Sequence, residues 1–475
     1  MKCLFCTSEA LPFVATGGLG DVSGALPKIL CKKGIDCRVI LPLYECIDRN
    51  FYNIKFIKSF TVPVAWRNQY CGLFECLYND TKYYFIDNEY YFKRNGIYGH
   101  YDDAERFAFF SRACIETLKH LDFKVDIIHC NDWQTALIPI YKSKIYYEDN
   151  FYSDIKTIFT IHNIQYQGKY SMDIINDVFG ISNNDKNILE FDGCINLMKG
   201  AIETSNKITT VSTTYAEEIC YPYYSHGLDS IVRNNKWKLY GIVNGIDIDL
   251  YNPKIDKFIY SNYSYENLEK KLENKLKLQE HLNLKVNQSI PIIAMVTRLA
   301  EHKGMDIVKY AFEKMINEKD FQFIILGSGD SEYESFFYNM QCKYPFKVSC
   351  CRGFVTELSH KIYAASDIFL MPSKSEPCGL SQMIALRYGS IPIVRNTGGL
   401  KDTVRDSGDG FGVGFVFNNY DANDMVNAIY RAIEGYKNKE GWNLLMKRAM
   451  KEDNSWNKSA SKYINLYNSI LNPKF

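Results

Sequence analysis

The chain has 475 residues, more than the roughly 250–300 at which one hydrophobic core stops growing, so we expect two domains. Hydrophobic residues make up 46% and charged residues 23% of the chain, which is typical of a globular protein and excludes a disordered or fibrous one. The net charge is +1 and no dense block of Lys and Arg occurs, which argues against a nucleic-acid partner or a membrane-surface role.

The cysteines predict an intracellular, reducing environment. There are 15 of them, they are scattered, and the only CxxC pattern, Cys3 to Cys6, lies in an apolar run, so we expect reduced thiols, with this pair buried on a strand. No apolar run approaches the roughly 18 residues that a membrane span needs. Because the first strand begins at residue 2, we expect a cytoplasmic protein without a leader. The alternative is a plastid protein whose transit peptide was removed. The sequence leaves the oligomeric state open.

Short apolar runs recur along the chain and predict a parallel sheet architecture. They lack the alternation of half-buried strands, and they are rich in Ile, Val and Phe, as are strands covered on both faces. The segments between them are mostly long enough for a crossover helix, so the fold class is α/β. The predicted strands are residues 3–6, 37–41, 125–129, 155–161, 208–211, 239–243, 292–296, 321–326, 367–371 and 391–394.

The repetition occurs in two blocks, and we place the domain boundary near residue 243. Residues 241–247 are followed by Pro253 and by a polar stretch, expected to form a loop and a helix, that ends before residue 290. Residues 455–471 place Tyr463, Leu466 and Ile470 on one stripe, which predicts a terminal amphipathic helix.

Glycines and ionisable residues follow the predicted strands, where ligands bind in open α/β sheets. Two sheets whose strand ends face each other would bring these groups to one cleft. The segments concerned are residues 8–9, 16–21, 131–133, 162–163, 244–245, 297–304, 327–330, 375–379 and 397–399.

The glycine-rich segment Gly17, Gly18 and Gly20 precedes a helix that we expect to begin near Val22. Such a loop lets backbone N–H groups approach a phosphate or a sugar, although a tight turn is the structural alternative. The next glycine is Gly24, one residue too late for the dinucleotide fingerprint GxGxxG. No P-loop occurs either, so the pattern disfavours nicotinamide or flavin enzymes and P-loop kinases.

Four charged or titratable side chains are candidates for chemistry. Arg298 and Lys303 follow one predicted strand and can clamp a diphosphate, or can be solvated loop charges. Glu376 and His162 follow strands in the two halves, where a carboxylate can hydrogen-bond sugar hydroxyls or stabilise a cationic sugar carbon. A structural role is the alternative for each. No GxSxG, HExxH or EF-hand pattern occurs, so nothing calls for a metal.

Taken together, these motifs resemble the bacterial glycogen synthase and plant starch synthase family of glycosyltransferases. The resemblance runs through the whole chain, with the motifs in the family's order. It is carried by residues 16–22, 103–110, 160–168, 241–247, 297–299 with 303–304, 326–330, 376–380 and 397–404.

The resemblance implies the GT-B fold, with two Rossmann-like domains facing across a deep cleft. Residues 1–243 would form the acceptor-side domain, joined by the terminal helix 456–475, and residues 244–455 the nucleotide-sugar domain. The implied reaction moves glucose from ADP-glucose to the non-reducing end of an α-1,4-glucan, glycogen or starch, with retention of anomeric configuration and without a cofactor.

The resemblance also assigns site residues. Glu376, His162, Arg298 and Lys303 would be catalytic, with the two cations on the diphosphate and the other two on the glucosyl group. Glu9 and Asp132 would line the acceptor side of the cleft. Donor binding would fall to Gly17, Gly18, Asp21, Asn244, Phe354, Cys378, Gly379, Leu380, Thr397 and Gly398, with Phe354 stacking on the nucleobase.

Two positions refine the resemblance. Related sucrose synthases carry a second Glu eight residues after the first, where this chain has Ile384, which favours the glycogen and starch branch. The family often has Lys before its Thr-Gly-Gly motif, where this chain has Ala15. Loss of that cation leaves two alternatives: a UDP-glucose-dependent transferase, or a glucan-binding scaffold with weak catalysis.

Overall fold

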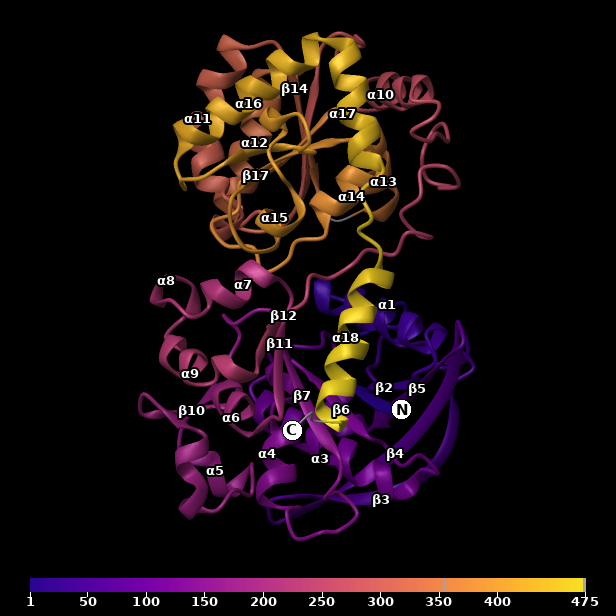
Figure 1. The fold of residues 1–475 in the computed structure, drawn as a ribbon, viewed down its shortest axis with the longest axis vertical. Coiled ribbons are helices and arrows are strands. Elements are labelled where there is room, and N and C mark those ends of the chain that lie inside the picture. The colour runs from indigo at the N-terminus through magenta and orange to yellow at the C-terminus, as the bar shows by residue number, and fades with distance from the viewer. Residues whose placement is uncertain (354, 473–475) are drawn as a thin grey trace. The chain divides into compact units, whose positions relative to one another are not determined.

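The computed structural model describes residues 1–353 and 355–472 (Figure 1). The chain divides into two compact units, the first formed by Met1–Val243 with Trp456–Phe475 and the second by Asn244–Ser455. Each unit contains one large sheet, of nine strands in the first and six in the second. Across the described residues, no helix combines the length and apolar character that crossing a membrane requires.

The nine-stranded sheet of the first unit has the order β12-β11-β7-β6-β1-β2-β5-β4-β3. Six of its strands match predicted ones and pair in parallel, which confirms the α/β prediction. These strands are β1 (Lys2–Cys6), β2 (Asp36–Pro42), β6 (Ile127–Asn131), β7 (Lys156–Ile161), β11 (Lys207–Thr210) and β12 (Leu239–Gly241).

The other edge of this sheet was not predicted. Strands β3 (Lys55–Val64), β4 (Arg67–Tyr78) and β5 (Thr81–Asp87) form an antiparallel meander, and β5 then pairs in parallel with β2. Most side chains of β3 are exposed or half-buried, so this strand lacks the apolar run that marks a strand covered on both faces.

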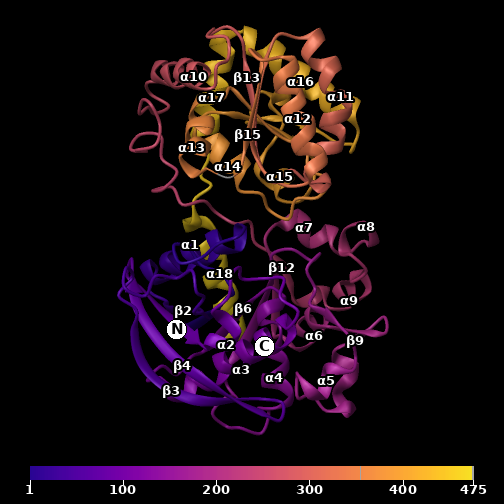
Figure 2. The same ribbon diagram turned by 180° about the vertical axis from the view of Figure 1, so that it is seen from behind.

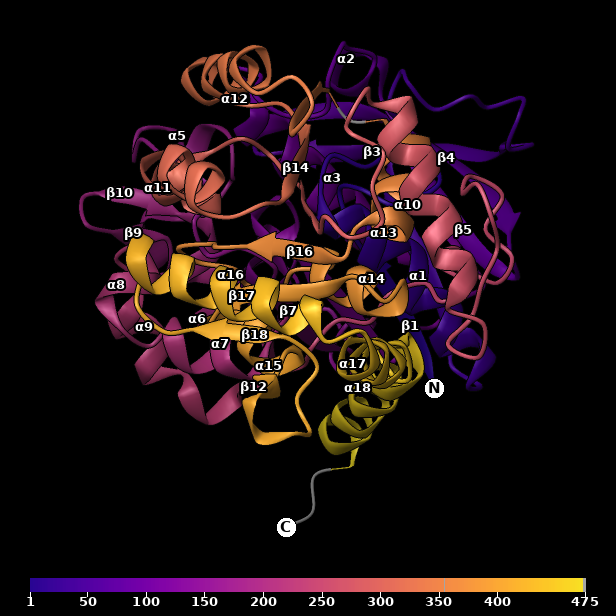
Figure 3. The same ribbon diagram turned by 90° about the horizontal axis from the view of Figure 1, so that it is seen from above.

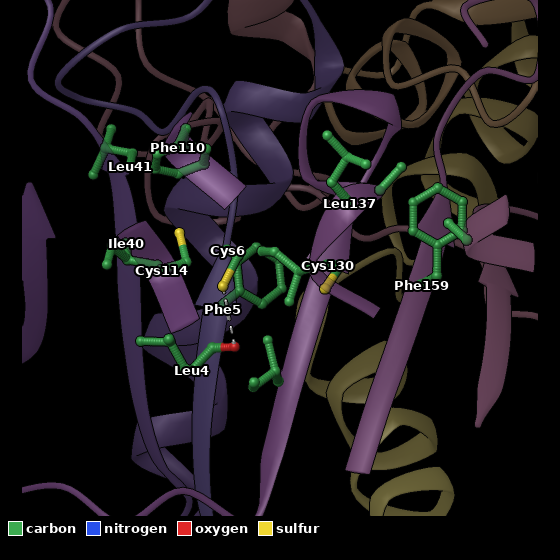
Figure 4. Close-up of a cluster of buried hydrophobic side chains, with 14 of the residues drawn as sticks. Leu4, Phe5, Cys6, Ile40, Leu41, Phe110, Cys114, Cys130, Leu137 and Phe159 are labelled. Atoms are coloured by element: carbon green, nitrogen blue, oxygen red, sulfur yellow. Dashed lines mark hydrogen bonds between the residues drawn. The ribbon is translucent and has the colours of Figure 1, made fainter. Parts of the chain in front are cut away.

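Helices pack on this sheet and complete its core. Figure 4 shows Cys6 of β1 among side chains from α3, α4 and the neighbouring strands, including Cys114 and Cys130. All 15 cysteines carry free thiols, and Cys3 and Cys6 are fully buried on β1, as predicted. The helices of this unit include α1 (Gly18–Lys32), α2 (Glu89–Phe92), α3 (Asp103–Thr117), α4 (Leu137–Lys144), α6 (Leu197–Thr204) and α7 (Thr213–Glu218).

The terminal helix α18 (Trp456–Leu471) belongs to the first unit. Its predicted stripe of Tyr463, Leu466 and Ile470 is buried, which confirms the amphipathic pattern. The hydroxyl of Tyr467 lies 2.7 Å from Nδ1 of His129 on β6, so the helix is also held by a polar contact within the core.

A three-stranded sheet, β8 (Lys169–Tyr170), β10 (Cys194–Asn196) and β9 (Glu190–Phe191), accompanies the main sheet of the first unit. Figures 1 and 2 show it along the same side of the unit as α5 (Ile174–Asp177), α8 (Pro222–Ser225) and α9 (Asp229–Asn234). Its strands are too short to carry a periodicity, so the sequence did not predict them.

The sheet of the second unit is entirely parallel, in the order β15 (Val348–Arg352), β14 (Gln322–Gly327), β13 (Ile292–Val296), β16 (Ile368–Met371), β17 (Ile391–Arg395) and β18 (Phe415–Phe417). The four central strands match the predicted ones, and the two edge strands were missed. The helices, seen around this sheet in Figure 3, are α10 (Glu269–His281), α11 (Met305–Glu318), α12 (Ser331–Lys343), α13 (Thr356–Ala365), α14 (Ser381–Arg387), α15 (Gly398–Thr403), α16 (Ala422–Lys437) and α17 (Lys439–Met450).

Candidate active site

Two strand ends of the first unit place His162 beside Asp132. The carboxylate Oδ1 of Asp132, after β6, accepts a hydrogen bond of 2.7 Å from the backbone N–H of His162, after β7. The imidazole Nε2 of His162 lies 2.9 Å from Oδ1 of Asn131. Asp132 has φ 55°, in the left-handed region, so the turn after β6 is shaped to aim its carboxylate at the next strand end.

Burial sets the charge state of this pair. It lowers the pKa of His162 to about 3, so the imidazole is neutral at physiological pH. Burial also raises the pKa of Asp132 to about 7, although backbone N–H groups of His162 and Asn163 favour its ionised form. A neutral imidazole and a carboxyl group that titrates near neutrality suit hydrogen bonding to hydroxyl groups of a ligand.

The raised pKa of Asp132 predicts a pH-dependent stability. Between the usual value of 3.8 and about 7, the folded protein holds a proton that the unfolded chain releases. Stability therefore falls as the pH rises through this window. Asp132→Asn keeps the side-chain oxygen that accepts from His162 but cannot ionise, so we expect the variant to gain stability relative to the parent with rising pH, by on the order of a few kcal/mol. Urea unfolding of both proteins at the two ends of this pH window measures the difference. If the unfolding free energies of the parent and the variant changed in parallel with pH, the prediction would be contradicted.

Glu9 organises the loop that leads into α1. Its carboxylate accepts hydrogen bonds from the backbone N–H of Thr16 at 2.5 Å, from the Thr16 hydroxyl at 2.9 Å and from the Tyr98 hydroxyl at 2.6 Å. Only 4% of Glu9 is exposed, so its oxygens are directed to the protein. Burial and the neighbouring charge of Glu9 raise the pKa of Asp21, in the first turn of α1, to about 6.

The exposed residues Ala15 to Gly18 form the entrance to this helix, which begins at Gly18 rather than near Val22. The 15-residue helix therefore directs its free N–H groups at the loop itself, an arrangement that suits an anion. Close packing explains why positions 20 and 24 are glycine. A Cβ at Gly20 would lie 2.4 Å from Cβ of Ala15, and a Cβ at Gly24 would lie 2.6 Å from the carbonyl oxygen of Leu11.

Packing does not explain the glycine at position 17, so a substitution there can test whether this loop binds a ligand. Its φ of −168° is extended backbone that any residue adopts, and a Cβ there would meet nothing within 4 Å. We expect Gly17→Ala to leave the melting temperature unchanged while raising, roughly tenfold, KM for the nucleotide sugar that the sequence motifs imply, because the methyl group would fill space that we expect this ligand to use. Thermal unfolding measures the melting temperature, and saturation curves with the donor measure KM. An unchanged KM would remove Gly17 from the site.

In the second unit, Lys303 and Glu376 form an ion pair. The Nζ of Lys303, which follows β13, lies 2.6 Å from Oε2 of Glu376, which follows β16. The hydroxyl of Ser373 donates a second hydrogen bond of 3.0 Å to the same oxygen. The Glu376 side chain is only 8% exposed and that of Lys303 only 19%. Both charged groups are therefore largely shielded from water, and their short contact orients each toward the other.

Tight turns hold Glu376 in place. Gly398 has φ +44°, and a Cβ there would lie 1.9 Å from the carbonyl oxygen of Glu376. The backbone N–H of Gly399 donates to the same carbonyl at 3.1 Å. Gly379 has φ +72° and packs against Gln382, whose amide donates to the carbonyl oxygens of Cys378 and Gly379. Close backbone contacts thus require Gly398 and Gly399, whereas Gly379 is favoured by its positive φ and lies against the Gln382 side chain.

Arg298 is exposed, and no hydrogen bond or ion pair joins its side chain to another residue that the structure describes. It lies close enough to His302 that its charge, with that of Lys303, adds to burial in lowering the pKa of His302. Two cations therefore lie near Glu376, one of them paired with it, and such a cluster can accept an anionic ligand.

The remaining candidates of the second unit lie around these turns. Burial raises the pKa of Cys378 to about 12, and the backbone N–H of Asn244 hydrogen-bonds to this sulfur. The side-chain Oδ1 of Asn244 is buried without a hydrogen-bond partner among the described residues. Leu380 and Thr397 are the N-cap residues of α14 and α15. Phe354, the predicted nucleobase contact, lies outside the described residues.

The sequence did not single out several residues that shape these clusters. Ser373 precedes Glu376 by one short turn and had no motif to mark it, and Tyr98 reaches Glu9 across 89 positions of sequence. Asn131 stood among the strand-end residues, but its contact with the His162 ring follows only from the register of β6 and β7.

Comparison with known proteins identifies the family of the chain. Residues 2–234 match the family described as starch synthase catalytic domain, and residues 277–443 match glycosyl transferases group 1. The glycogen synthases of Clostridium perfringens and Bacillus cereus are 51% and 50% identical to this chain; each alignment covers 99% of the chain, and 98% and 100% of the relative, respectively.

Solved structures agree with this kinship. The catalytic domain of starch synthase IV from Arabidopsis thaliana, bound to ADP and acarbose, superposes with a TM-score of 0.91 at 34% identity, covering 99% of both chains. Sucrose-phosphate synthase from Thermosynechococcus elongatus, at 16% identity and a TM-score of 0.61 over 99% of this chain and 98% of its own, shares the fold alone. The fold is that of the GT-B glycosyltransferases. Within this class, the chain belongs to the glycogen synthase and starch synthase family, as its motifs predicted.

Proposed function

We propose that the protein transfers glucose from ADP-glucose to the non-reducing end of an α-1,4-glucan, with retention of anomeric configuration. The observation that carries this proposal is the Lys303–Glu376 ion pair with Arg298 beside it, at the strand ends of the second unit. In this arrangement, two cations that we propose to bind a diphosphate lie near a carboxylate that we propose to face a sugar. The kinship with glycogen synthases, and with a starch synthase that binds ADP and acarbose, supports this donor and acceptor.

The second unit is proposed to hold the donor. Arg298 and Lys303 would bind the diphosphate and stabilise it as it leaves. Glu376 would face the glucosyl group and stabilise positive charge at the anomeric carbon. The backbone at Gly379, Leu380, Thr397 and Gly398 would line this pocket, with Asn244 and Cys378 supporting it and Phe354 on the nucleobase.

The first unit is proposed to hold the acceptor and to touch the donor phosphates. Gly17 and Gly18 would bring backbone N–H groups to the phosphates, with Asp21 and Glu9 shaping that loop. In the tautomer where Nε2–H of His162 donates to Asn131, its Nδ1 is an acceptor for a sugar hydroxyl. Asp132 would fix this arrangement by holding the backbone of His162.

The proposed chemistry balances without a protein nucleophile. The bond between the anomeric carbon and the diphosphate oxygen breaks while the bond to the acceptor hydroxyl oxygen forms on the same face. The acceptor proton passes to an oxygen of the leaving diphosphate, whose charge the two cations stabilise. Since the donor supplies both the glucosyl group and the leaving group, we expect no cofactor, and we expect the reaction to occur in the cytoplasm, where nucleotide sugars are available.

Transfer of labelled glucose to glycogen from ADP-glucose or UDP-glucose, at equal concentration, tests the donor assignment. We expect ADP-glucose to be preferred, because the starch synthase that this chain resembles was solved with ADP bound, whereas Arg298 and Lys303 would act on the diphosphate that both donors share. A preference for UDP-glucose would revise the donor. If neither donor labels glycogen while the protein is folded, the proposed function is wrong.

A further inference from the structure

Tyr420 connects the two segments that carry Lys303 and Glu376. It lies between β18 and α16, is half-buried, and packs against the core of the second unit. No motif of the sequence includes it. Its hydroxyl lies 3.3 Å from the carbonyl oxygen of Glu301, and it donates a hydrogen bond to the carboxylate of Asp306. These two residues stand two positions before and three positions after Lys303, so one side chain holds both ends of the turn that carries this lysine.

The Tyr420 hydroxyl is a permanent donor at physiological pH. Burial, the hydrogen bond to Asp306 and the charge of this carboxylate raise the pKa of Tyr420, so the hydroxyl stays protonated. A hydrogen bond to a carboxylate is stronger than one between neutral groups. Because Asp306 lies in the first turn of α11, this hydrogen bond ties the start of the helix that follows Lys303 to Tyr420.

The ring of Tyr420 lies against the segment that leads to Glu376. Nζ of Lys374 and Cζ of Arg395 are each 5.7 Å from the centre of the ring, within the range of a cation–π interaction. Arg395, the last residue of β17, donates a hydrogen bond of 2.5 Å to the carbonyl oxygen of Lys374. Lys374 precedes Glu376 by two residues. Tyr420 therefore contacts both sides of the candidate site, one through its hydroxyl and the other through its ring.

The two segments also contact each other through their backbones. The backbone N–H of Lys374 donates to the carbonyl oxygen of His302 at 2.9 Å. Gly304 has φ +82°, and a Cβ there would lie 2.3 Å from the carbonyl oxygen of Pro372. The ion pair of the candidate site spans these two segments, so its geometry depends on how they are held together.

We propose that Tyr420 is a positioning residue for the transfer reaction, which holds the turn that carries Lys303 where this lysine meets the donor diphosphate. The inference rests on the proposed function, since it takes Lys303 as a ligand of the diphosphate. Tyr420 acts through Lys303 rather than on a substrate. A displacement of about 1 Å in a catalytic group can cost about a hundredfold in rate, so the loss of one of these contacts should be measurable.

Tyr420→Phe removes the hydroxyl and keeps the ring. We expect kcat with ADP-glucose to fall roughly tenfold and Kd for ADP, from titration calorimetry, to rise roughly threefold. KM for glycogen should stay within about twofold of the parent, and the melting temperature should change little, because the ring still packs and water can reach the half-buried Asp306.

The matched control is Tyr430→Phe. The hydroxyl of Tyr430 donates to Oε2 of Glu318 at 2.6 Å, and Nζ of Lys319 lies 5.1 Å from the centre of its ring. This variant loses the same kind of hydrogen bond in the same unit, and it should keep the kcat and Kd of the parent. An equal loss of kcat in both variants would overturn the proposal.

A double-mutant cycle with Lys303→Ala separates positioning from a purely structural role. Because Tyr420 acts through Lys303, Tyr420→Phe should change kcat and Kd by less than about twofold in the Lys303→Ala background. Labelled donor and long incubation make the low rates of that background measurable. An undiminished tenfold loss there, or an unchanged kcat in Tyr420→Phe alone, would overturn the proposal.

ADP binding keeps failure of this proposal distinct from failure of the proposed function. If the parent transferred no glucose from either donor, but Tyr420→Phe weakened ADP binding only in the presence of Lys303, the proposed function would be wrong and the positioning role would stand. If the parent neither transferred glucose nor bound ADP, both would be wrong.

Discussion

Glu376→Ala and Lys303→Ala are each expected to lower kcat by about a thousandfold, since each removes a charge that acts where charge develops in the transition state. The two side chains lie 2.6 Å apart and largely out of water. Steady-state rates with ADP-glucose and glycogen measure the effect. Both variants should fold, because the core of the second unit contains neither side chain. Unchanged turnover in either variant would remove that residue from the proposed site.

The Lys303–Glu376 ion pair predicts that substitutions of its two residues have non-additive effects on the unfolding free energy. Lys303→Ala leaves the Glu376 carboxylate nearly buried, with the Ser373 hydroxyl as its remaining side-chain donor among the described residues, so it should cost about 1–3 kcal/mol. The double variant removes both charges and should cost less than the sum of the single variants by at least about 1 kcal/mol. Urea unfolding of the four proteins measures this coupling. Additive losses would mean that the two groups do not interact in solution.

Gly398→Ala is expected to impair both stability and activity. The new Cβ would lie 1.9 Å from the carbonyl oxygen of Glu376, closer than any real contact, so the backbone that carries Glu376 must move. We expect a loss of more than about 2 kcal/mol in unfolding free energy, and a loss of at least about a hundredfold in kcat/KM.

Gly410→Ala is the matched control for this substitution. Gly410 lies in the same unit at φ +81°, but a Cβ there would meet nothing within 4 Å. It carries the left-handed backbone cost of about 1 kcal/mol without the collision. Thermal unfolding and initial rates of the two variants separate the effects. If both variants lost the same stability and activity, backbone strain alone would explain Gly398, and its contact with Glu376 would have no special role.

Most parallel strands of each sheet could be predicted from the sequence, because a strand covered on both faces has a continuous apolar run. Ile292–Val296 is an example, and all five of its residues are buried. The meander β3–β5 could not be predicted in the same way, since most side chains of Lys55–Val64 remain exposed or half-buried. The edge strand Phe415–Phe417 is too short to show a pattern.

The candidate site could be predicted from the sequence only in part. Motifs singled out Lys303 and Glu376 separately, but 73 positions divide them, and their ion pair follows from the neighbouring positions of β13 and β16 in the sheet. The ring contact of His162 likewise depends on the parallel register of two strands. Residues 160–168 formed a motif, but the contacts of Gln167 with His226 and Asn196 could not be predicted from it, because they join segments that the chain brings together only through short irregular elements.

The most direct test of the account is to locate newly added glucose in the product. Glycogen is incubated with the protein and radiolabelled ADP-glucose, and the product is digested with β-amylase, which removes maltose units from non-reducing ends. We predict that the label enters glycogen and is released in the first maltose units, and that Glu376→Ala incorporates almost none. Label that stays in the undigested core, or no incorporation by a folded parent protein, would contradict glucosyl transfer to the non-reducing end.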